Sequence, residues 1–234
     1  MINDFINTTF ASSNLDDYII RTAIFKAIVE NIHLFEGDLL DIGCGKMPYK
    51  EYILKHSQTK SYAGLDIETA LQYDSIVKPD YTWDAIKMPF EDNSFHSAFG
   101  TEVLEHCHEP EVILKETYRV LKTGGSFFFT VPFLWPLHEV PNDACRYTPF
   151  SLERHLKNSG FKDIQIKATG GWHAAMAQML ALWIKRGPIS RKKRKWLIFI
   201  FKPIIKVLIK KSKAEKVVFK EGQMITGLYG FAKK

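Results

Sequence analysis

The stretch Asp38-Leu39-Leu40-Asp41-Ile42-Gly43-Cys44-Gly45 decides the fold of this 234-residue chain. Its apolar run is typical of a short buried strand, and two glycines one residue apart follow it. Glycines at these positions permit a tight turn and let the backbone come close to a ligand. The segment therefore predicts a buried strand, a tight turn and the start of a helix.

Strands and helices alternate on both sides of this turn. We expect helices over residues 15–34, 110–121 and 148–158, with a helix stop and turn at 122–125. Strands are expected over residues 38–43, 61–67, 81–84, 97–101, 126–131, 161–168 and 222–233. This alternation predicts an α/β domain, a mostly parallel sheet with helices on both faces, spanning residues 1–234. Residues 172–222 form an insert between the sixth and seventh strands.

Length and composition exclude several classes of protein. A chain of 234 residues buries a full core without disulfide or metal crosslinks. The cysteines at positions 44, 107 and 145 form no close pair, which argues against a disulfide framework and a zinc-cysteine site. The first residues lack a basic segment followed by an apolar run, and no apolar stretch reaches the roughly 18–20 residues of a membrane span. We therefore expect a cytoplasmic protein.

Acidic residues stand at the predicted carboxyl ends of the first three strands. Asp41 precedes the glycine turn, where its carboxylate would repel a pyrophosphate. A dinucleotide-binding turn would also have a third glycine at position 48, where this chain has Pro48. Both features argue against a dinucleotide ligand. Asp66 can accept the two hydroxyls of a ribose, and Asp84 the amino group of an adenine. Each aspartate alone could equally be a cap or turn residue. Together they suit S-adenosylmethionine, which carries an ammonium and a sulfonium group.

Four ordered stretches resemble the motifs of class I S-adenosylmethionine-dependent methyltransferases: DIGCG at 41–45, GLD at 64–66, MPFEDNSF at 88–95 and TEVLEH at 101–106. The resemblance covers residues 36–168 and the last strand. It implies a Rossmann-like seven-stranded sheet whose last strand is antiparallel and lies beside the fifth. The residues that it implies for cofactor binding are Asp41, Gly43, Cys44, Gly45, Asp66, Asp84, Ala85, Thr101 and Glu102.

Residues 132–148, after the fifth strand, form a long loop at the ligand-binding edge, where long loops usually build sites. Their HExPxDxxRYT pattern resembles that of type 11-like bacterial methyltransferases associated with sugar and polysaccharide modification. We expect His138 to be the general base, and Arg146 and Tyr147 to position the acceptor. The alternative is a structural loop held by an ion pair between Asp143 and Arg146.

A metal site is the alternative to an imidazole base. Glu102, Glu105 and His106, with His138, resemble the ExxEH-plus-His arrangement of some magnesium-dependent O-methyltransferases. A divalent ion held there would lower the pKa of an acceptor hydroxyl. Because ExxEH is also common where no metal is used, we assign no metal ligand.

The positive charge is concentrated in the insert. Residues 185–216 contain 13 Lys and Arg and a single acid, which gives a local charge of +12. The remainder of the chain has a net charge of −6, so the whole chain has a net charge of +6. Residues 196–209 are apolar but are interrupted by Lys202, Pro203 and Lys206, so they cannot span a bilayer. We expect residues 191–211 to contact an anionic membrane surface. The alternatives are a lid packed on the sheet, a dimer seam, or RNA binding.

The sequence thus predicts a methyltransferase that modifies a hydroxyl of a sugar, or of a glycan or lipid-linked intermediate, and that is peripheral at the inner face of the membrane. Other acceptors considered are a quinone precursor and an RNA, for which the basic insert is a weaker match. A catalytically silent regulatory protein that binds S-adenosylmethionine is the alternative from a different class. The oligomeric state has no sequence signature.

Overall fold

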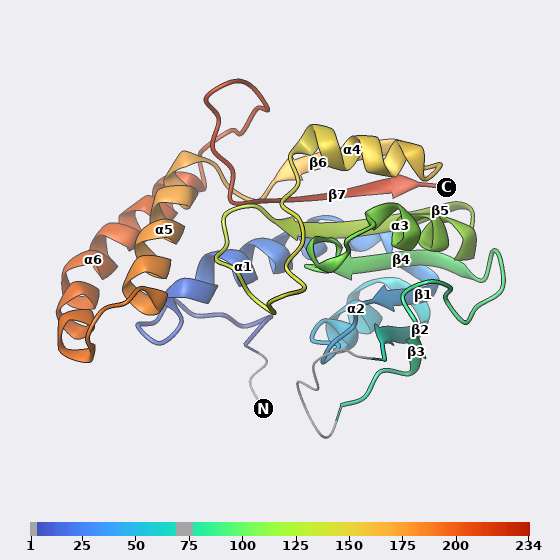
Figure 1. Cartoon of the computed structure of the whole chain (residues 1–234), viewed down its shortest axis with the longest axis horizontal. Helices are drawn as coiled ribbons and strands as arrows, with labels where there is room; N and C mark the ends of the chain where they lie inside the picture. Colours follow the sequence, from blue (N-terminus) through green and yellow to red (C-terminus); the bar gives the residue numbers. More distant parts are fainter. Residues whose placement is uncertain (1–3, 69–76) are drawn as a thin grey trace.

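A seven-stranded sheet forms the centre of the computed structural model, which describes residues 4–68 and 77–234 (Figure 1). The strands are β1 (Glu36–Ile42), β2 (Gln58–Ile67), β3 (Tyr81–Trp83), β4 (Phe95–Thr101), β5 (Leu121–Pro132), β6 (Lys162–Ala168) and β7 (Gly227–Lys233). Their order is β3-β2-β1-β4-β5-β7-β6, and β7 is antiparallel to both of its neighbours. The predicted fold class is confirmed, including the place of the last strand beside the fifth.

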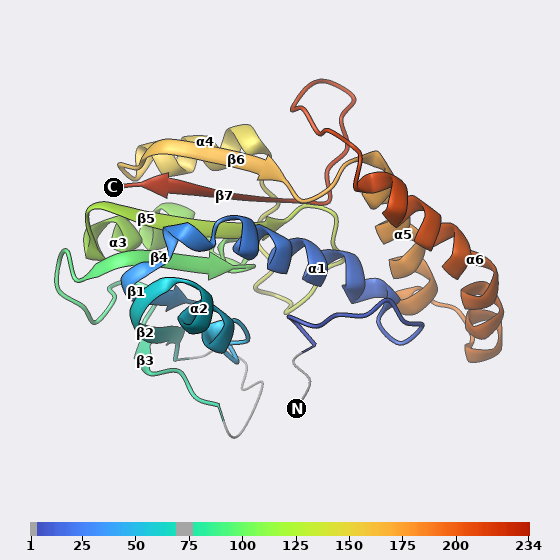
Figure 2. The ribbon, with the colours of Figure 1, turned by 180° about the vertical axis from the view of Figure 1, so that it is seen from behind.

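Helices cover both faces of the sheet. The helices α1 (Leu15–Glu30) and α2 (Lys50–His56) lie on the face seen in Figure 2, and α3 (Pro110–Val120) and α4 (Pro149–Asn158) lie on the opposite face. Alternate residues of β5 supply the two cores: Phe127 and Phe129 pack in one cluster, and Phe128 packs in the other. This alternation explains the run of three phenylalanines in β5, since both faces of the strand are buried at residues 127–129.

Several predicted boundaries differ from the structure by a few residues, and the last strand, expected over residues 222–233, begins only at Gly227. The helix expected to reach residue 34 ends at Glu30 and is followed by the 3-10 turn η1 (Ile32–Leu34). Residues 122–125, expected as a helix stop and turn, belong to β5, where the register shifts between the pairs Phe95–Leu121 and Ser97–Ser126. The glycines there form a bulge inside a strand, a local irregularity that one sequence does not distinguish from a turn.

The insert between β6 and β7 consists of two helices, α5 (Trp172–Arg186) and α6 (Arg191–Ser212). Both lie beyond the edge of the sheet at which the parallel strands end, as both ribbon views show (Figures 1 and 2). A third apolar cluster joins them to α1 through buried residues such as Leu15, Ala181 and Ile205. The predicted helical insert is therefore present, and it stands at the carboxyl edge of the sheet.

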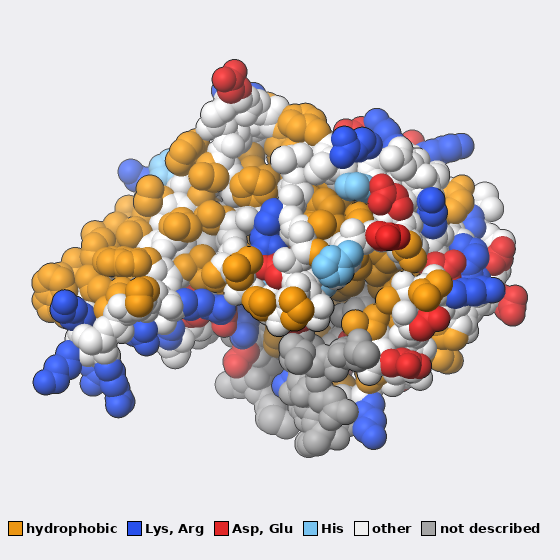
Figure 3. Space-filling view, viewed as in Figure 1, with side chains coloured by type: hydrophobic (Ala, Val, Ile, Leu, Met, Phe, Trp, Pro, Cys, Tyr) orange, Lys and Arg blue, Asp and Glu red, His pale blue; other side chains and the backbone are white. Residues whose placement is uncertain are grey.

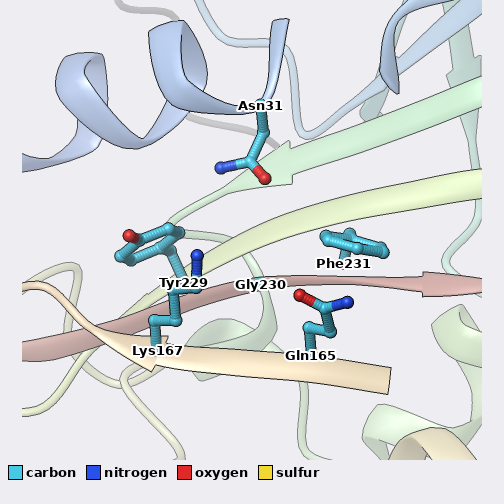
Figure 4. A pocket seen from close by; sticks show the side chains of 6 residues that line it. All are labelled: Asn31, Gln165, Lys167, Tyr229, Gly230 and Phe231. Carbon is cyan, nitrogen blue, oxygen red and sulfur yellow. The ribbon is translucent and has the colours of Figure 1, made fainter. Parts of the chain in front are cut away.

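Gly230 allows β6 and β7 to approach each other. A Cβ atom at this position would lie 2.0 Å from the backbone oxygen of Gln165 on β6. The glycine lies at a shallow, open depression with about 160 Å³ of empty space, lined also by Asn31, Lys167, Tyr229 and Phe231 (Figure 4). The depression lies over paired residues of β6 and β7 and has no carboxylate in its lining, so it is not the predicted cofactor site.

We predict that Gly230→Ala lowers the free energy of unfolding by about 2–3 kcal/mol, because backbone cannot move away as a flexible side chain can. Gly222→Ala is the control: Gly222 has φ +75 but a Cβ there meets nothing within 4 Å, so only the left-handed strain of about 1 kcal/mol applies. Urea unfolding followed by circular dichroism measures both. Equal losses for the two variants would contradict the close approach at Gly230.

Candidate functional site

The glycine turn after β1 is tied to the end of β2. The backbone amides of Gly43 and Cys44 both donate to the carbonyl of Leu65, at 2.8 and 3.1 Å. Gly43 has φ +65, and a Cβ there would lie 2.5 Å from the side chain of Val103, which follows β4. Only glycine fits this position, because both the backbone conformation and the space exclude a side chain.

Asp66 closes the turn from the neighbouring strand. One carboxylate oxygen accepts from the amide of Gly45 at 3.0 Å, and the other accepts from the amide of Ile67 at 2.9 Å. Burial raises the pKa of Asp66 despite these two hydrogen bonds. The predicted partners Gly45 and Asp66 are thus brought together, and the carboxylate stands next to the glycine turn, where the resemblance places a ribose.

Asp41 is buried beneath the turn, with 3% of its surface exposed. Its carboxylate accepts a hydrogen bond from the hydroxyl of Tyr62 on β2. Burial, reinforced by the nearby charge of Asp66, raises the pKa of Asp41 to about 8. Sequence reasoning missed Tyr62, because only the pairing of β1 with β2 shows that its hydroxyl reaches Asp41.

Asp84 and Ala85 form an exposed turn after β3. One oxygen of Asp84 accepts from the amides of Ile86 and Lys87 at 2.9 and 3.0 Å, and these bonds lower the pKa of Asp84. Ala85 has a φ of 64°, in the left-handed region. These contacts are those of a turn residue, the alternative weighed from the sequence. Adenine recognition by Asp84 and Ala85 stays a prediction.

Thr101 ends β4, and Glu102 directly after it has a left-handed backbone with φ 56°. The Glu102 carboxylate accepts from the Thr130 hydroxyl of β5 at 2.7 Å, and its amide donates to the Thr130 carbonyl at 3.1 Å. Burial raises the pKa of Glu102 to about 7. The carboxylate is therefore held against β5, at the sheet edge where the resemblance predicts the methionine part of the cofactor.

The loop of residues 133–148 folds back over the segment that follows β4. The amides of Ala144 and Cys145 donate to the carbonyl of Glu105 at 2.8 and 3.0 Å. The ring of His106 donates from Nδ1 to the carbonyl of Asn142, at 3.2 Å. These contacts bring His138 next to His106, with ring centroids 4.8 Å apart.

His138 lies between two carboxylates. Its Nδ1 is 3.3 Å from Asp143, and its Nε2 is 4.0 Å from Glu105. Burial lowers the pKa of His138, which favours the neutral imidazole that a general base requires. The guanidinium of Arg146 binds Asp143 and holds the pKa of that carboxyl at about 2. Asp143 is therefore charged, and it faces the ring nitrogen opposite the one that faces Glu105.

Tyr147 and Arg146 have structural contacts. Tyr147 is buried, with 2% of its surface exposed, and its hydroxyl donates to the carbonyl of Leu104 at 2.8 Å. Its expected part in positioning the acceptor is not supported by these contacts, which are those of a core residue. Arg146 makes the ion pair with Asp143 that the sequence offered as the alternative, and it also donates to the Cys145 carbonyl at 2.9 Å.

Three side chains at this site could hold a divalent cation. Ligand atoms of Glu105, His106 and His138 all lie within 4.8 Å of one another. Glu105 is fully buried, and neither of its carboxylate oxygens has a hydrogen-bond partner among residues 4–68 and 77–234. Glu102, which the ExxEH arrangement would add, is bound to Thr130 and does not belong to this cluster. The donor set is one carboxylate and two imidazoles.

Comparisons with known proteins agree with the fold. Residues 40–129, from β1 into β5, match the family described as a methyltransferase domain. A sterol 24-C-methyltransferase of Aspergillus fumigatus is 34% identical over 38% of this chain and 26% of its own length. A tRNA U34 carboxymethyltransferase of Nautilia profundicola is 28% identical over 70% of this chain and 58% of its own length.

The structure of Haemonchus contortus phosphoethanolamine N-methyltransferase 2 in complex with S-adenosyl-L-methionine superposes with a TM-score of 0.56, at 16% identity. The match covers 99% of this chain and 59% of that one. The chain therefore carries a methyltransferase domain with the fold of S-adenosylmethionine-dependent enzymes, as the sequence motifs predicted. It spans about a quarter to three fifths of the length of the two curated relatives.

We predict that Asp41 makes stability fall as the pH rises. The pKa of Asp41 is about 8 in the folded chain, whereas the ordinary value of 3.8 applies to the unfolded chain. As the pH rises, the unfolded chain therefore loses this proton at a lower pH than the folded chain does. The free energy of unfolding then decreases between about pH 4 and pH 8, by at most about 1.4 kcal/mol per pH unit. Asp41→Asn retains an acceptor for Tyr62 and removes this part of the slope.

Urea unfolding at pH 5, 6, 7 and 8 measures the slopes of the wild type and Asp41→Asn. Asp84→Asn serves as the control, since Asp84 is exposed and its pKa is lowered, out of this pH range. Identical slopes for wild type and Asp41→Asn would show that Asp41 ionises normally in the folded chain.

Proposed function

We propose that this protein transfers the methyl group of S-adenosylmethionine to a hydroxyl oxygen of a sugar, on a glycan or lipid-linked intermediate. The observation that carries the proposal is the assembled carboxyl edge. Gly45 is hydrogen-bonded to Asp66 beside the glycine turn, and His138, a half-buried histidine whose pKa is lowered by burial, stands in the loop that follows β5. The methyltransferase domain over residues 40–129 supports the cofactor assignment.

The cofactor fits the charges at this edge. S-adenosylmethionine supplies an activated methyl group on a sulfonium and carries a second positive charge on its ammonium. Asp41 and Asp66 lie under and beside the glycine turn, and Glu102 lies at the end of β4. Burial raises the pKa of all three carboxyls, so a cationic ligand would favour their charged forms. This recognition would be electrostatic.

Methyl transfer is a displacement in line with the bond from sulfur to the methyl carbon, so the protein mainly aligns the acceptor. A hydroxyl acceptor is weakly nucleophilic and gains from a base that removes its proton. We assign this role to His138, whose pKa is lowered and whose other ring nitrogen faces Asp143. Arg146 positions Asp143, and through it the histidine.

The sugar acceptor rests on the HExPxDxxRYT pattern of residues 138–148 and on the need of a hydroxyl for a base. The curated relatives are named for other acceptors, a sterol and a tRNA. The apolar and basic surface of α5 and α6 favours an acceptor carried by a lipid, at the anionic inner face of a membrane.

A second mechanism is supported by Glu105, whose buried carboxylate lacks a partner. A divalent cation bound by Glu105, His106 and His138 would lower the pKa of the acceptor hydroxyl in place of an imidazole base. The two mechanisms differ in their response to a chelator, which abolishes the metal-assisted reaction and leaves the imidazole reaction unchanged.

We predict that the protein binds S-adenosylmethionine and that Asp66→Asn weakens binding at least about tenfold, because the substitution removes the charge next to the glycine turn. Isothermal titration calorimetry with S-adenosylmethionine and S-adenosylhomocysteine measures the effect. Asp163→Asn, an exposed aspartate on β6, is the matched control and should bind like the wild type. Unchanged affinity in Asp66→Asn would contradict the assigned cofactor site.

We predict that His138→Asn lowers the rate of methyl transfer by about 10²–10⁴-fold and leaves cofactor affinity unchanged. The assay follows the radiolabelled methyl group of S-adenosylmethionine into glycolipid and polysaccharide fractions, with and without excess chelator. His108→Asn, on an exposed histidine nearby, is the control. Equal rates in His138→Asn and wild type would exclude the base. Cofactor binding without transfer to either fraction would favour the silent regulatory protein.

A further inference from the structure

The helix α5 exposes an apolar stripe along one face. Trp172, Met176, Met179 and Trp183 are each 47–50% exposed. Their spacings of four, three and four residues place them on the same side of the helix. The opposite side buries Ala177, Ala181 and Ile184 in the cluster shared with α1 and α6. The stripe lies outside the cluster that attaches α5 to the domain, although Trp172 donates to the Gly222 carbonyl and Trp183 contacts α6.

The helix α6 continues this apolar surface. Trp196, Phe199, Ile204 and Val207 are 62%, 82%, 44% and 54% exposed, whereas Ile205 is fully buried against the other helices. The rings of Trp183 and Phe201 meet edge to face, with centroids 6.2 Å apart, and join the two helices. Figure 3 shows hydrophobic side chains gathered over α5 and α6, with Lys and Arg side chains at their far end.

The charges beside this surface are almost all positive. Residues 172–214 contain 12 Lys and Arg and no Asp or Glu. The next acid, Glu215, already caps α5, where its carboxylate accepts from the amides of Trp172 and His173 at 2.7 and 3.1 Å. Lys192, Lys193 and Lys195 are exposed and make no ion pair within the described chain. These cations therefore remain available to a partner.

The basic cluster of residues 191–195 also stands in an unfavourable place for helix stability. It forms the first turn of α6, where the helix dipole favours acids and disfavours cations by about 0.3–1 kcal/mol each. Within the described chain, Arg194 is the one side chain of this cluster that makes hydrogen bonds, which it donates to the carbonyls of Gly187 and Ile189. A partner with negative charge would offset this cost.

The surface is next to the proposed acceptor loop. The guanidinium of Arg186, in the last turn of α5, lies over the ring of Trp135 with 4.6 Å to its centroid. Trp135 belongs to the loop that carries His138. A partner bound to α5 and α6 would thus lie at the end of the sheet at which methyl transfer is proposed.

We propose that the surface formed by the exposed apolar residues of α5 and α6 and by the basic cluster 191–195 docks on an anionic lipid bilayer. Exposed Trp and Phe side chains with a basic flank are suited to the lipid headgroup region. No helix among the described residues is long and apolar enough to cross a bilayer. Two copies facing each other through this surface would bring like charges together. The inference deepens the proposed function, on which it rests for a lipid-linked acceptor.

Co-sedimentation of the full chain with phosphatidylcholine vesicles, with and without 30% phosphatidylglycerol, tests this proposal. We expect binding only to the anionic vesicles, and a decrease in binding at high salt. Replacing Arg191, Lys192, Lys193 and Lys195 by Gln should weaken binding at least about 100-fold, since each cation contributes about fivefold. The double variant Trp196→Ser, Phe199→Ser should weaken it as well.

Matched controls separate a local effect from a general one. Replacing the exposed Lys55, Lys60, Lys115 and Lys157 by Gln removes the same charge elsewhere, and Phe150→Ser removes a ring that is 67% exposed on α4. Both should bind anionic vesicles within about threefold of the wild type. Equal binding to neutral vesicles, no binding, or equal loss in the controls would overturn the proposal.

Light scattering identifies the competing occupant. A dimer that the Trp196→Ser, Phe199→Ser variant dissociates would assign this surface to a second copy and overturn the proposal. Calorimetry with S-adenosylmethionine in the absence of lipid is independent of docking. Intact cofactor binding without vesicle binding would therefore refute the docking surface alone, and not the proposed methyltransferase.

Discussion

The contact of the left-handed Gly43 with Val103 is the constraint on which the carboxyl edge of the sheet depends. It brings the turn after β1 against the segment after β4, and the bonds from Gly43 and Cys44 to Leu65 fix the same turn to β2. Three strand ends are thereby held together at one point. Parallel strands alone would place these ends at one edge, but only loosely. The turn converts that edge into a fixed array of backbone amides and carboxylates.

Three buried carboxyls lie at the site, and their burial lowers the free energy of unfolding. Asp41, Glu102 and Glu105 lie in surroundings that raise the pKa of each, and Glu105 has no hydrogen-bond partner for either oxygen. Burying an unpaired acid is unfavourable, and an apolar residue of similar size would pack with less penalty. A cationic ligand, as we propose for this edge, would compensate these carboxyls, and perturbed acids commonly mark a binding site.

The sequence predicted the fold and the proximity of Gly45 to Asp66 well, since both depend on local patterns, and the cofactor-binding roles of these residues stay predictions. Apolar runs ending in glycine or aspartate mark strand ends, and the topology then brings Gly45 to Asp66. Contacts that depend on register were not predictable: Tyr62 reaches Asp41 only through the pairing of β1 with β2. Tyr147 shows the limit of motif reasoning, because a tyrosine beside an arginine is equally typical of a site and of a core. Burial distinguishes the two, and a single sequence does not report burial.

In the insert, the residues that pack against the domain differ from the residues that are exposed to a partner. Packing of α5 and α6 against α1 needs only the buried faces of the two helices, including Ala177, Ala181 and Ile205. Trp196, Phe199 and the basic first turn of α6 lie outside that packing, and the helix dipole makes the basic turn mildly unfavourable. Residues that weaken an element without serving its packing are best explained by a partner outside the chain. The acidic body and the basic insert therefore suit different partners: the carboxyls suit a cationic cofactor, and the insert suits the anionic surface that we propose.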